Sequence, residues 1–210
     1  MMKSKAYIFD MDGTLVNNCH YHIIAWQEFS RRYGRELTEK EIIDWMGAPN
    51  TYYCEQIFGR PLSSEELARL GEEKERIYRA LYAPHMRLPD GLRDFLDRAH
   101  AEDIPCAVAT GGPKENVDFV MDGLSIRGDF AAIVDASCYT RGKPAPDCFL
   151  AAAAKLGVPP SACTVFEDAV AGIRAAKAAG MKVVAVTFTN PRETLQKESP
   201  DRIIDTYTEI

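Results

Sequence analysis

The chain has 210 residues, of which 46% are hydrophobic, and its formal net charge is -6 at pH 7. This length and apolar content suffice for a sizeable core, either as one ordinary domain or as a core domain with a smaller insert. A net-acidic chain is not attracted to nucleic acids or anionic membranes, so we expect neither as a partner, although a local basic pocket for a small anion is compatible with the charge.

The six cysteines lie far apart and include no C-x-x-C pair and no zinc-binding spacing. We therefore expect free thiols in a reducing compartment. The first nine residues, MMKSKAYIF, lack the apolar stretch of a signal peptide, and no apolar run approaches transmembrane length. These features together predict a cytoplasmic protein.

The first predicted strand is AYIF (6–9), and it ends in two carboxylates, Asp10 and Asp12, followed by a glycine. A D-x-D-G sequence also occurs in calcium-binding loops. With Asp10 at the first position of such a loop, however, Leu15 occupies the glycine position and Tyr21 the terminal glutamate position. The pattern therefore excludes an EF-hand loop.

Residues 16–87 contain no strand pattern and are predicted to be helical. Apolar and aromatic side chains recur at helical spacing in 21–33, and Ser63 with Glu66 forms a plausible capping box for a second helix. A crossover between parallel strands needs only about a dozen residues, so this much longer stretch predicts a small helical domain inserted after the first strand. The Pro/Gly turn in LPDGL (88–92) then returns the chain to the core.

Short apolar runs rich in β-branched residues recur after the insert and are separated by helical patterns. They are CAVAT (106–110), AAIVD (131–135), CTVF (163–166) and KVVAV (182–186), and RIID (202–205) is a candidate edge strand. Strands of this type alternating with helices are typical of a parallel sheet covered on both faces. We predict an α/β fold, a Rossmann-like three-layer core of residues 1–15 and 88–210, with an inserted α-helical domain formed by residues 16–87.

Polar side chains follow several of the predicted strands. Thr110 precedes two glycines after the second strand, and Glu167 and Asp168 end the fourth. The carboxyl ends of parallel strands meet at one edge of a sheet, where open α/β folds bind ligands. Lys143 stands in GKPAPDCF, where two prolines restrict the loop before a helix. We expect these residues to converge with Asp10.

The expected cluster contains four carboxylates, which would repel one another strongly without a cation. Oxygen ligands of this kind suit Mg²⁺, which also retains waters and a phosphate oxygen of the substrate. Thr110, the N–H groups of Gly111 and Gly112, and Lys143 form a complementary cradle for a phosphate dianion. A metal, a carboxylate and a lysine around a phosphoryl group are the parts needed for phosphoryl transfer.

Each of these residues also has an ordinary structural interpretation. A single aspartate here would more often be a solvated turn residue, Thr110 a helix N-cap, and Lys143 a surface lysine. Glu167 and Asp168 would serve equally well to cap the following helix. The functional interpretation rests on the whole set, because each member follows a predicted strand or precedes a predicted helix at the same edge.

The motifs DMDGTL, TGG, GKPAPDCF and FEDAVAGIRAAKAAGM resemble the four signature motifs of the haloacid dehalogenase superfamily. The spacing and the insert resemble its branch with a helical cap between the first two motifs, which contains β-phosphoglucomutase and small sugar-phosphate phosphatases. The resemblance covers essentially the whole chain. It implies a phosphatase or phosphomutase that acts on a small phosphorylated metabolite, and a monomer is the default for a capped enzyme of this size.

By this resemblance Asp10 is the nucleophile that forms an aspartyl-phosphate. Asp12 is the general acid and base, and its backbone carbonyl binds Mg²⁺ together with Asp10 and Asp168. Glu167 supports the metal's ligand shell.

The resemblance gives Thr110, Gly111 and Lys143 the task of holding the transferred phosphoryl group. YHIIAW (21–26) resembles the first cap helix of this branch, which places His22 near the leaving group. We take as further candidates for substrate binding four polar or aromatic residues: Trp26, Asn50, Lys74 and Lys114.

Departures from the mutase pattern favour hydrolysis. In the mutase, a cap arginine and a Ser–Lys pair after the second motif hold a second phosphate, whereas the corresponding positions here are Asn50, Gly112 and Pro113, with Lys114 one place further on. Loss of a guanidinium opposite a dianion is not conservative. The MGAPN loop (46–50) resembles that of fructose-1-phosphate-type phosphatases. We therefore predict a phosphatase, with β-phosphoglucomutase as the alternative.

Two other classes share parts of this pattern. A dehalogenase attacks carbon and needs no acid at the second position, so Asp12 argues against it. A phospho-acceptor receiver domain also uses Asp, Thr, Lys and Mg²⁺, but it lacks both the large insert and the D-x-D sequence after its strand. Mg²⁺-dependent release of phosphate discriminates between an enzyme and such a binding module.

Overall fold

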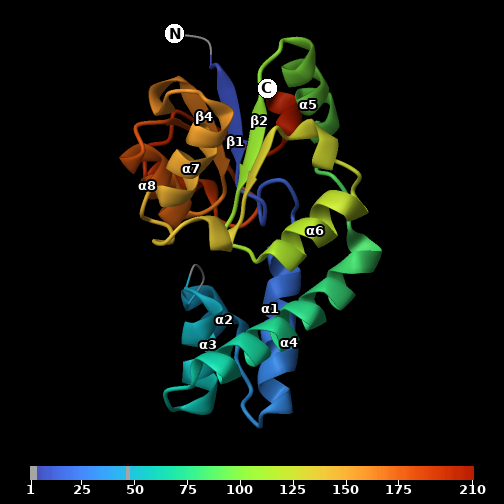
Figure 1. The fold of residues 1–210 in the computed structure, drawn as a ribbon. Coiled ribbons are helices and arrows are strands. Elements are labelled where there is room, and N and C mark those ends of the chain that lie inside the picture. The colour runs from blue at the N-terminus through green and yellow to red at the C-terminus, as the bar shows by residue number, and fades with distance from the viewer. Residues whose placement is uncertain (1–3, 46–47) are drawn as a thin grey trace. The chain divides into compact units, whose positions relative to one another are not determined.

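The structure is a computed structural model and describes residues 4–45 and 48–210 (Figure 1). The chain divides into two compact units. The first comprises the residues up to Asn17 and those from Arg87 to Ile210, and the second comprises Asn18–Met86. The chain thus leaves the first unit and returns to it once.

The first unit is built on a parallel sheet, which has six strands in the described part of the chain. The strands are β1 (Ala6–Phe9), β2 (Cys106–Ala109), β3 (Ala132–Val134), β4 (Cys163–Glu167), β5 (Lys182–Val186) and β6 (Arg202–Ile204). Their order across the sheet is β3-β2-β1-β4-β5-β6, and every neighbouring pair is parallel. The predicted α/β fold is confirmed, including the edge strand β6.

Helices cover both faces of this sheet. Figure 1 shows α7 and α8 on one side and α5 and α6 on the other. The helices of the unit are α5 (Leu92–Ala101), α6 (Lys114–Gly123), α7 (Asp147–Leu156), α8 (Val170–Ala178) and the short α9 (Arg192–Gln196). This is the three-layer arrangement that a buried parallel sheet requires.

The packing of strand β1 explains why its sequence is apolar throughout. Successive side chains of a strand point to opposite faces. Ile8 is fully buried in the core that includes Phe149 of α7 and Ile173 of α8. Tyr7 and Phe9 contact the ring of Phe95 from α5, with ring centroids 5.0 and 6.1 Å apart. Both faces of the strand are therefore packed against helices.

The register of β1 brings the polar residues at its end next to those of β4. Phe9 is paired with Phe166, so the next residues on the two strands are Asp10 and Glu167. On the other side Phe9 is paired with Val108, two residues before Thr110. The carboxyl edge of the sheet therefore gathers side chains that are far apart in sequence.

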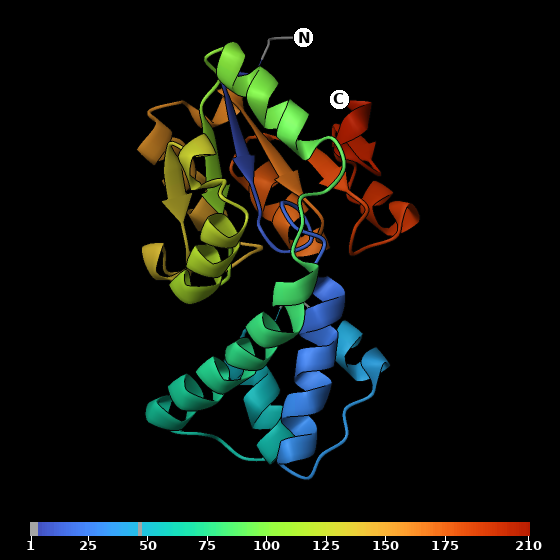
Figure 2. The same cartoon turned by 90° about the vertical axis from the view of Figure 1, so that its right-hand side faces the viewer.

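The second unit is helical in all the regular elements that the structure describes (Figure 2). Its helices are α1 (Cys19–Arg32), α2 (Glu39–Asp44), α3 (Asn50–Phe58) and α4 (Ser64–Tyr82). The capping box predicted at the start of α4 is present, because the Ser63 hydroxyl accepts from the Glu66 N–H and the Glu66 carboxylate accepts from the Ser63 N–H. Helix α4 packs against both α1 and α3.

All six cysteines are free, as the sequence predicts. Within the described ranges, no helix combines the length and the apolar character needed to cross a membrane.

Candidate active site

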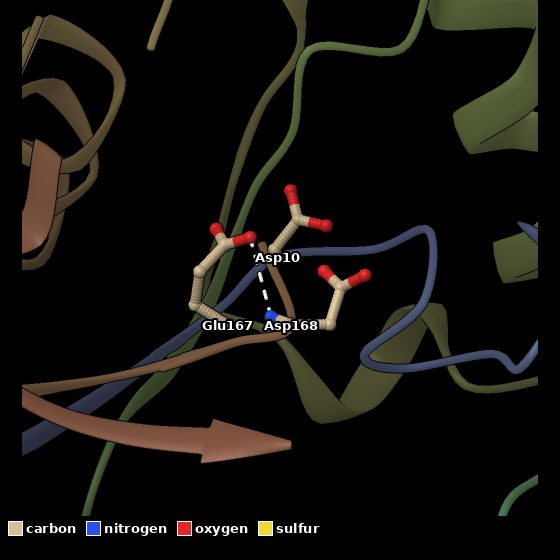
Figure 3. Close-up of side chains that lie close together, drawn as sticks. All are labelled: Asp10, Glu167 and Asp168. Atoms are coloured by element: carbon tan, nitrogen blue, oxygen red, sulfur yellow. Dashed lines mark hydrogen bonds between the residues drawn. The ribbon is translucent and has the colours of Figure 1, made fainter. Parts of the chain in front are cut away.

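Three buried carboxylates meet at the carboxyl edge of the sheet (Figure 3). Asp10 directly follows β1, Glu167 is the last residue of β4, and Asp168 follows it. Their exposed fractions are 6%, 1% and 3%. One carboxylate oxygen from each lies within 4.8 Å of the others. Three acidic side chains are thus buried together at this edge of the sheet, where acidic residues would ordinarily be exposed to solvent.

Lys143 supplies the positive charge that faces this cluster. It lies in the loop before α7, and its Nζ is 2.6 Å from Asp10 Oδ1 and 2.6 Å from Glu167 Oε2. Burial by itself lowers the pKa of Lys143, but the charges of Asp10 and Glu167 outweigh it and hold that pKa above its ordinary value. Lys143 is therefore a protonated lysine aimed inward, as the two prolines after it led us to expect.

The carboxylates remain crowded despite this lysine. Burial, opposed by the charge of Lys143, raises the pKa of Asp10 to about 7. Burial and the charges of Glu167 and Asp10 also raise the pKa of Asp168. Among the described residues one ammonium group faces three carboxylates, so the ionised set carries excess negative charge in a buried place. An all-oxygen donor set of this kind fits a hard divalent cation.

Glu167 has a second, structural task. Its Oε1 accepts the backbone N–H groups of Asp168 and Ala169 at 3.2 and 3.1 Å, while its Oε2 accepts from Lys143. Both N–H groups lie in the turn before α8, whose N-cap is Ala169 and has no side-chain capping bond, so Glu167 fixes this turn without being the N-cap of the helix. The other oxygen, Oε2, belongs to the cluster and accepts from Lys143.

The loop after β2 forms the second half of the site. Thr110 is buried, and its Oγ1 accepts the Gly112 N–H at 3.0 Å. A Cβ placed on Gly112 would lie 3.4 Å from Thr110 Oγ1 and 3.5 Å from Asp12 Oδ2. The Asp12 carboxylate therefore approaches the same loop as Thr110. The Gly112 N–H is engaged within the loop, which differs from our expectation that it faces a ligand.

Three further residues support the site, and two of them lie outside the sequence motifs. The Tyr139 hydroxyl donates to the Thr110 carbonyl at 3.1 Å, and the buried Tyr207 hydroxyl donates to the Thr14 carbonyl at 3.3 Å. The Thr14 hydroxyl in turn donates to Asp168 Oδ1 at 3.2 Å. The one signal for Thr14 is its place in DMDGTL. No sequence pattern points to Tyr139 or Tyr207, and only the folded structure shows that they contact the site.

Gly13 offers a direct test of how tightly this loop is packed. Its φ is +75°, and a Cβ there would overlap Asp168 Oδ2 and Thr189 Oγ1. Gly34 has nearly the same φ, +76°, with no atom close to the position of its Cβ. We expect Gly34→Ala to lower the free energy of unfolding by about 1–2 kcal/mol through backbone strain alone. Gly13→Ala should cost more and also weaken divalent-cation binding, because Asp168 must move.

Urea unfolding and calorimetric titration with Mg²⁺ measure the two effects. The matched φ values isolate the steric contribution at Gly13. Equal stability losses in the two variants, with cation affinity unchanged in both, would contradict the packing described above.

The candidate substrate residues of the second unit form one polar cluster. Lys74 is 2% exposed, and its Nζ lies 2.8 Å from His22 Nδ1 and 3.0 Å from Glu75 Oε1. The Asn50 amide donates to the same Glu75 oxygen at 2.8 Å. The Lys74 ammonium also lies 5.0 Å from the centroid of the Trp26 ring. Sequence reasoning missed Glu75, the residue that joins Asn50 to Lys74.

Two other expectations about substrate residues have different outcomes. Lys114 begins α6 and forms an ion pair with Asp118 one turn later, so the structure gives it a local partner on the helix surface. In the MGAPN loop, Met46 and Gly47 lie outside the described residues.

Comparison with known proteins supports the family resemblance. A family model described as haloacid dehalogenase-like hydrolase matches residues 4–180. The chain is 35% identical to fructose-1-phosphate phosphatase YqaB of Escherichia coli, covering 85% of this chain and 94% of that protein. It is 34% identical to β-phosphoglucomutase of Bacillus subtilis, covering 89% of this chain and 85% of that protein.

A solved structure supports the same resemblance. The crystal structure of a HAD hydrolase, family IA, variant 3, from Entamoeba histolytica superimposes with a TM-score of 0.92 at 32% identity. The match covers 98% of this chain and 95% of that one.

Proposed function

The chain belongs to the haloacid dehalogenase-like hydrolase family, and we propose that it is a Mg²⁺-dependent phosphatase of small phosphorylated metabolites that works through an aspartyl-phosphate. Relatives named as phosphatases and as β-phosphoglucomutase make it a phosphatase or a phosphomutase. The observation that carries the proposal is the Asp10 carboxylate, which Lys143 holds at the edge of a buried carboxylate cluster.

In the first step Asp10 attacks the phosphorus of the substrate. Lys143 donates to Oδ1 of the Asp10 carboxylate, which leaves the other Asp10 oxygen to form the new bond with phosphorus. The bond between phosphorus and the leaving oxygen breaks as Asp12 donates a proton to that oxygen. Lys143 and the Thr110 hydroxyl bind the phosphoryl oxygens, where negative charge accumulates.

In the second step water attacks the phosphorus of the aspartyl-phosphate. Asp12, now ionised, accepts the proton of that water, and Asp10 leaves as a carboxylate. The position of Asp12 beside the Thr110–Gly112 loop supports both roles, because this loop is the part of the site proposed to bind the phosphoryl group. One residue thus acts as acid and then as base, and the enzyme returns to its starting state.

We assign the divalent cation to Asp10, Glu167 and Asp168, with the backbone carbonyl of Asp12. The three carboxylates fit such an ion because they are buried, closely spaced and outnumber their one lysine partner. When bound, Mg²⁺ would offset the charge of the phosphate and the cluster and polarise the phosphoryl group.

The charge balance of the cluster around Lys74 favours hydrolysis over mutase activity. We propose that the second unit selects the leaving group, the role implied for the helical insert. Lys74 is neutralised by Glu75, and the Asn50 amide is directed at the same carboxylate. A second phosphate dianion would need an excess of positive charge, whereas hydroxyl groups of a sugar or polyol need only hydrogen-bonding partners. The cluster therefore supports a phosphatase that acts on a monophosphate.

A substrate screen tests this proposal. We expect phosphate release from p-nitrophenyl phosphate and from one or more sugar phosphates in Mg²⁺, and its loss on chelation. With β-glucose 1-phosphate and a bisphosphate activator, we expect no glucose 6-phosphate. Formation of glucose 6-phosphate would overturn the preference for hydrolysis. Failure to release phosphate from any substrate, with no glucose 6-phosphate formed, would reject the enzymatic proposal.

A further inference from the structure

The loop that follows β5 contributes two side chains to Asp168. Residues 187–190 leave the same edge of the sheet as Asp10 and Asp168. The Thr189 hydroxyl hydrogen-bonds to the Asp168 carboxylate. The Asn190 Nδ2 donates to the Asp168 backbone carbonyl at 3.0 Å. Asp168 is thus held by this loop at both its side chain and its main chain.

The contact between Thr189 and Asp168 is built into the packing. Both Thr189 Oγ1 and Asp168 Oδ2 occupy space that any side chain on Gly13 would fill. The Thr14 hydroxyl also donates to this carboxylate, at Asp168 Oδ1. One hydroxyl from each of two loops therefore reaches the Asp168 carboxylate.

Asp168 needs such support because its neighbours repel it. It is 3% exposed, and its carboxylate lies within 4.8 Å of the carboxylates of Asp10 and Glu167. The Thr189 hydroxyl beside the carboxylate and the Asn190 bond to the main chain both limit how far Asp168 can rotate. Without these contacts the carboxylate could turn away from its neighbours and lose the shared geometry of the cluster.

We propose that Thr189 and Asn190 are positioning residues that orient Asp168 toward the divalent cation. This inference rests on the cation site of the proposed function and assigns a task to a loop outside the four signature motifs. Residues that hydrogen-bond to a metal-ligating side chain and fix its orientation typically contribute about 10–100-fold to metal affinity. We expect Thr189 to contribute more than Asn190, because it contacts the ligand group itself.

The loop provides its own matched control. Thr187 lies two residues before Thr189, and its hydroxyl donates to Asp205 Oδ1 at 2.6 Å in an exposed position. Replacing threonine by valine removes the hydroxyl and conserves the shape at either site. Thr189→Val and Thr187→Val therefore differ in whether the lost hydrogen bond reaches Asp168.

The experiment measures the dissociation constant for Mg²⁺ by calorimetry on the full chain, without substrate. We expect Thr189→Val to raise it by about 10–100-fold and Thr187→Val to leave it within about two-fold of the wild type. Thr189→Ser, which retains the hydroxyl, should restore most of the affinity. Asn190→Ala provides an independent variant in case Thr189→Val does not fold, and it should also weaken binding.

Three results would overturn the inference. Thr189→Val and Asn190→Ala binding as tightly as the wild type would show that the loop does not position Asp168. Equal weakening by Thr189→Val and Thr187→Val would indicate a general effect of the loop. If the wild-type chain itself bound no Mg²⁺, the proposed cation site would fail along with the inference, whereas the first two results leave that site intact.

Discussion

Replacing Asp10 by Asn is expected to lower turnover by at least about 10⁴-fold, because the nucleophile of the proposed reaction is lost. An amide is a poor nucleophile and a poor metal ligand, and it forms a weaker hydrogen bond with Lys143 than the carboxylate does. Phosphate release from p-nitrophenyl phosphate in Mg²⁺ measures the loss. Circular dichroism on the same preparation shows whether the variant is folded.

Asp205→Asn is the matched control for this change. Asp205 is an exposed carboxylate that pairs with Arg192 and accepts from Thr187. The same chemical substitution there should leave turnover close to the wild-type value. Residual turnover near the wild type in Asp10→Asn would remove Asp10 from its proposed role.

Replacing Asp12 by Ala is expected to lower turnover by about 10²–10⁴-fold while still permitting phosphorylation of the enzyme. With p-nitrophenyl phosphate the leaving group is a weak base and needs little protonation, so the first step should proceed. The second step should stall, since no carboxylate remains to accept a proton from water. Rapid mixing should show one burst of p-nitrophenol followed by slow release of phosphate.

The burst distinguishes the proposed two-step scheme from direct attack by water. Wild-type rates of phosphate release in Asp12→Ala, or p-nitrophenol and phosphate appearing together from the first turnover, would contradict the assignment of Asp12.

The strands and the main site residues could be predicted because their signals are local. AYIF is apolar at every position since both faces of β1 are covered, and a run of this kind is visible without knowledge of its partners. Asp10, Thr110 and Glu167 could be brought together because parallel strands end at one edge. Lys74, a substrate candidate from the sequence, lies one turn from both Leu70 and Tyr78, and all three are buried in α4.

Other features depend on contacts that no local pattern reveals. Thr189 and Asn190 lie in a loop without periodicity, and they meet Asp168 across more than twenty residues of sequence. Glu75 resembles the many surface glutamates of α4, and its burial follows from its ion pair with Lys74. Helix α1 begins at Cys19, two residues before the helical pattern, and its N-cap Asn18 donates to the Tyr78 hydroxyl instead of capping the helix.

The central claim is that Asp10 becomes phosphorylated, and one measurement tests it most directly. Asp12→Ala is mixed with p-nitrophenyl phosphate and Mg²⁺, quenched in acid and reduced with borohydride, which converts an aspartyl-phosphate to homoserine. Mass spectrometry of the proteolytic peptides then locates the change. We predict homoserine at position 10 and at no other aspartate. An unmodified Asp10, or a change at a different residue, would contradict the proposed mechanism.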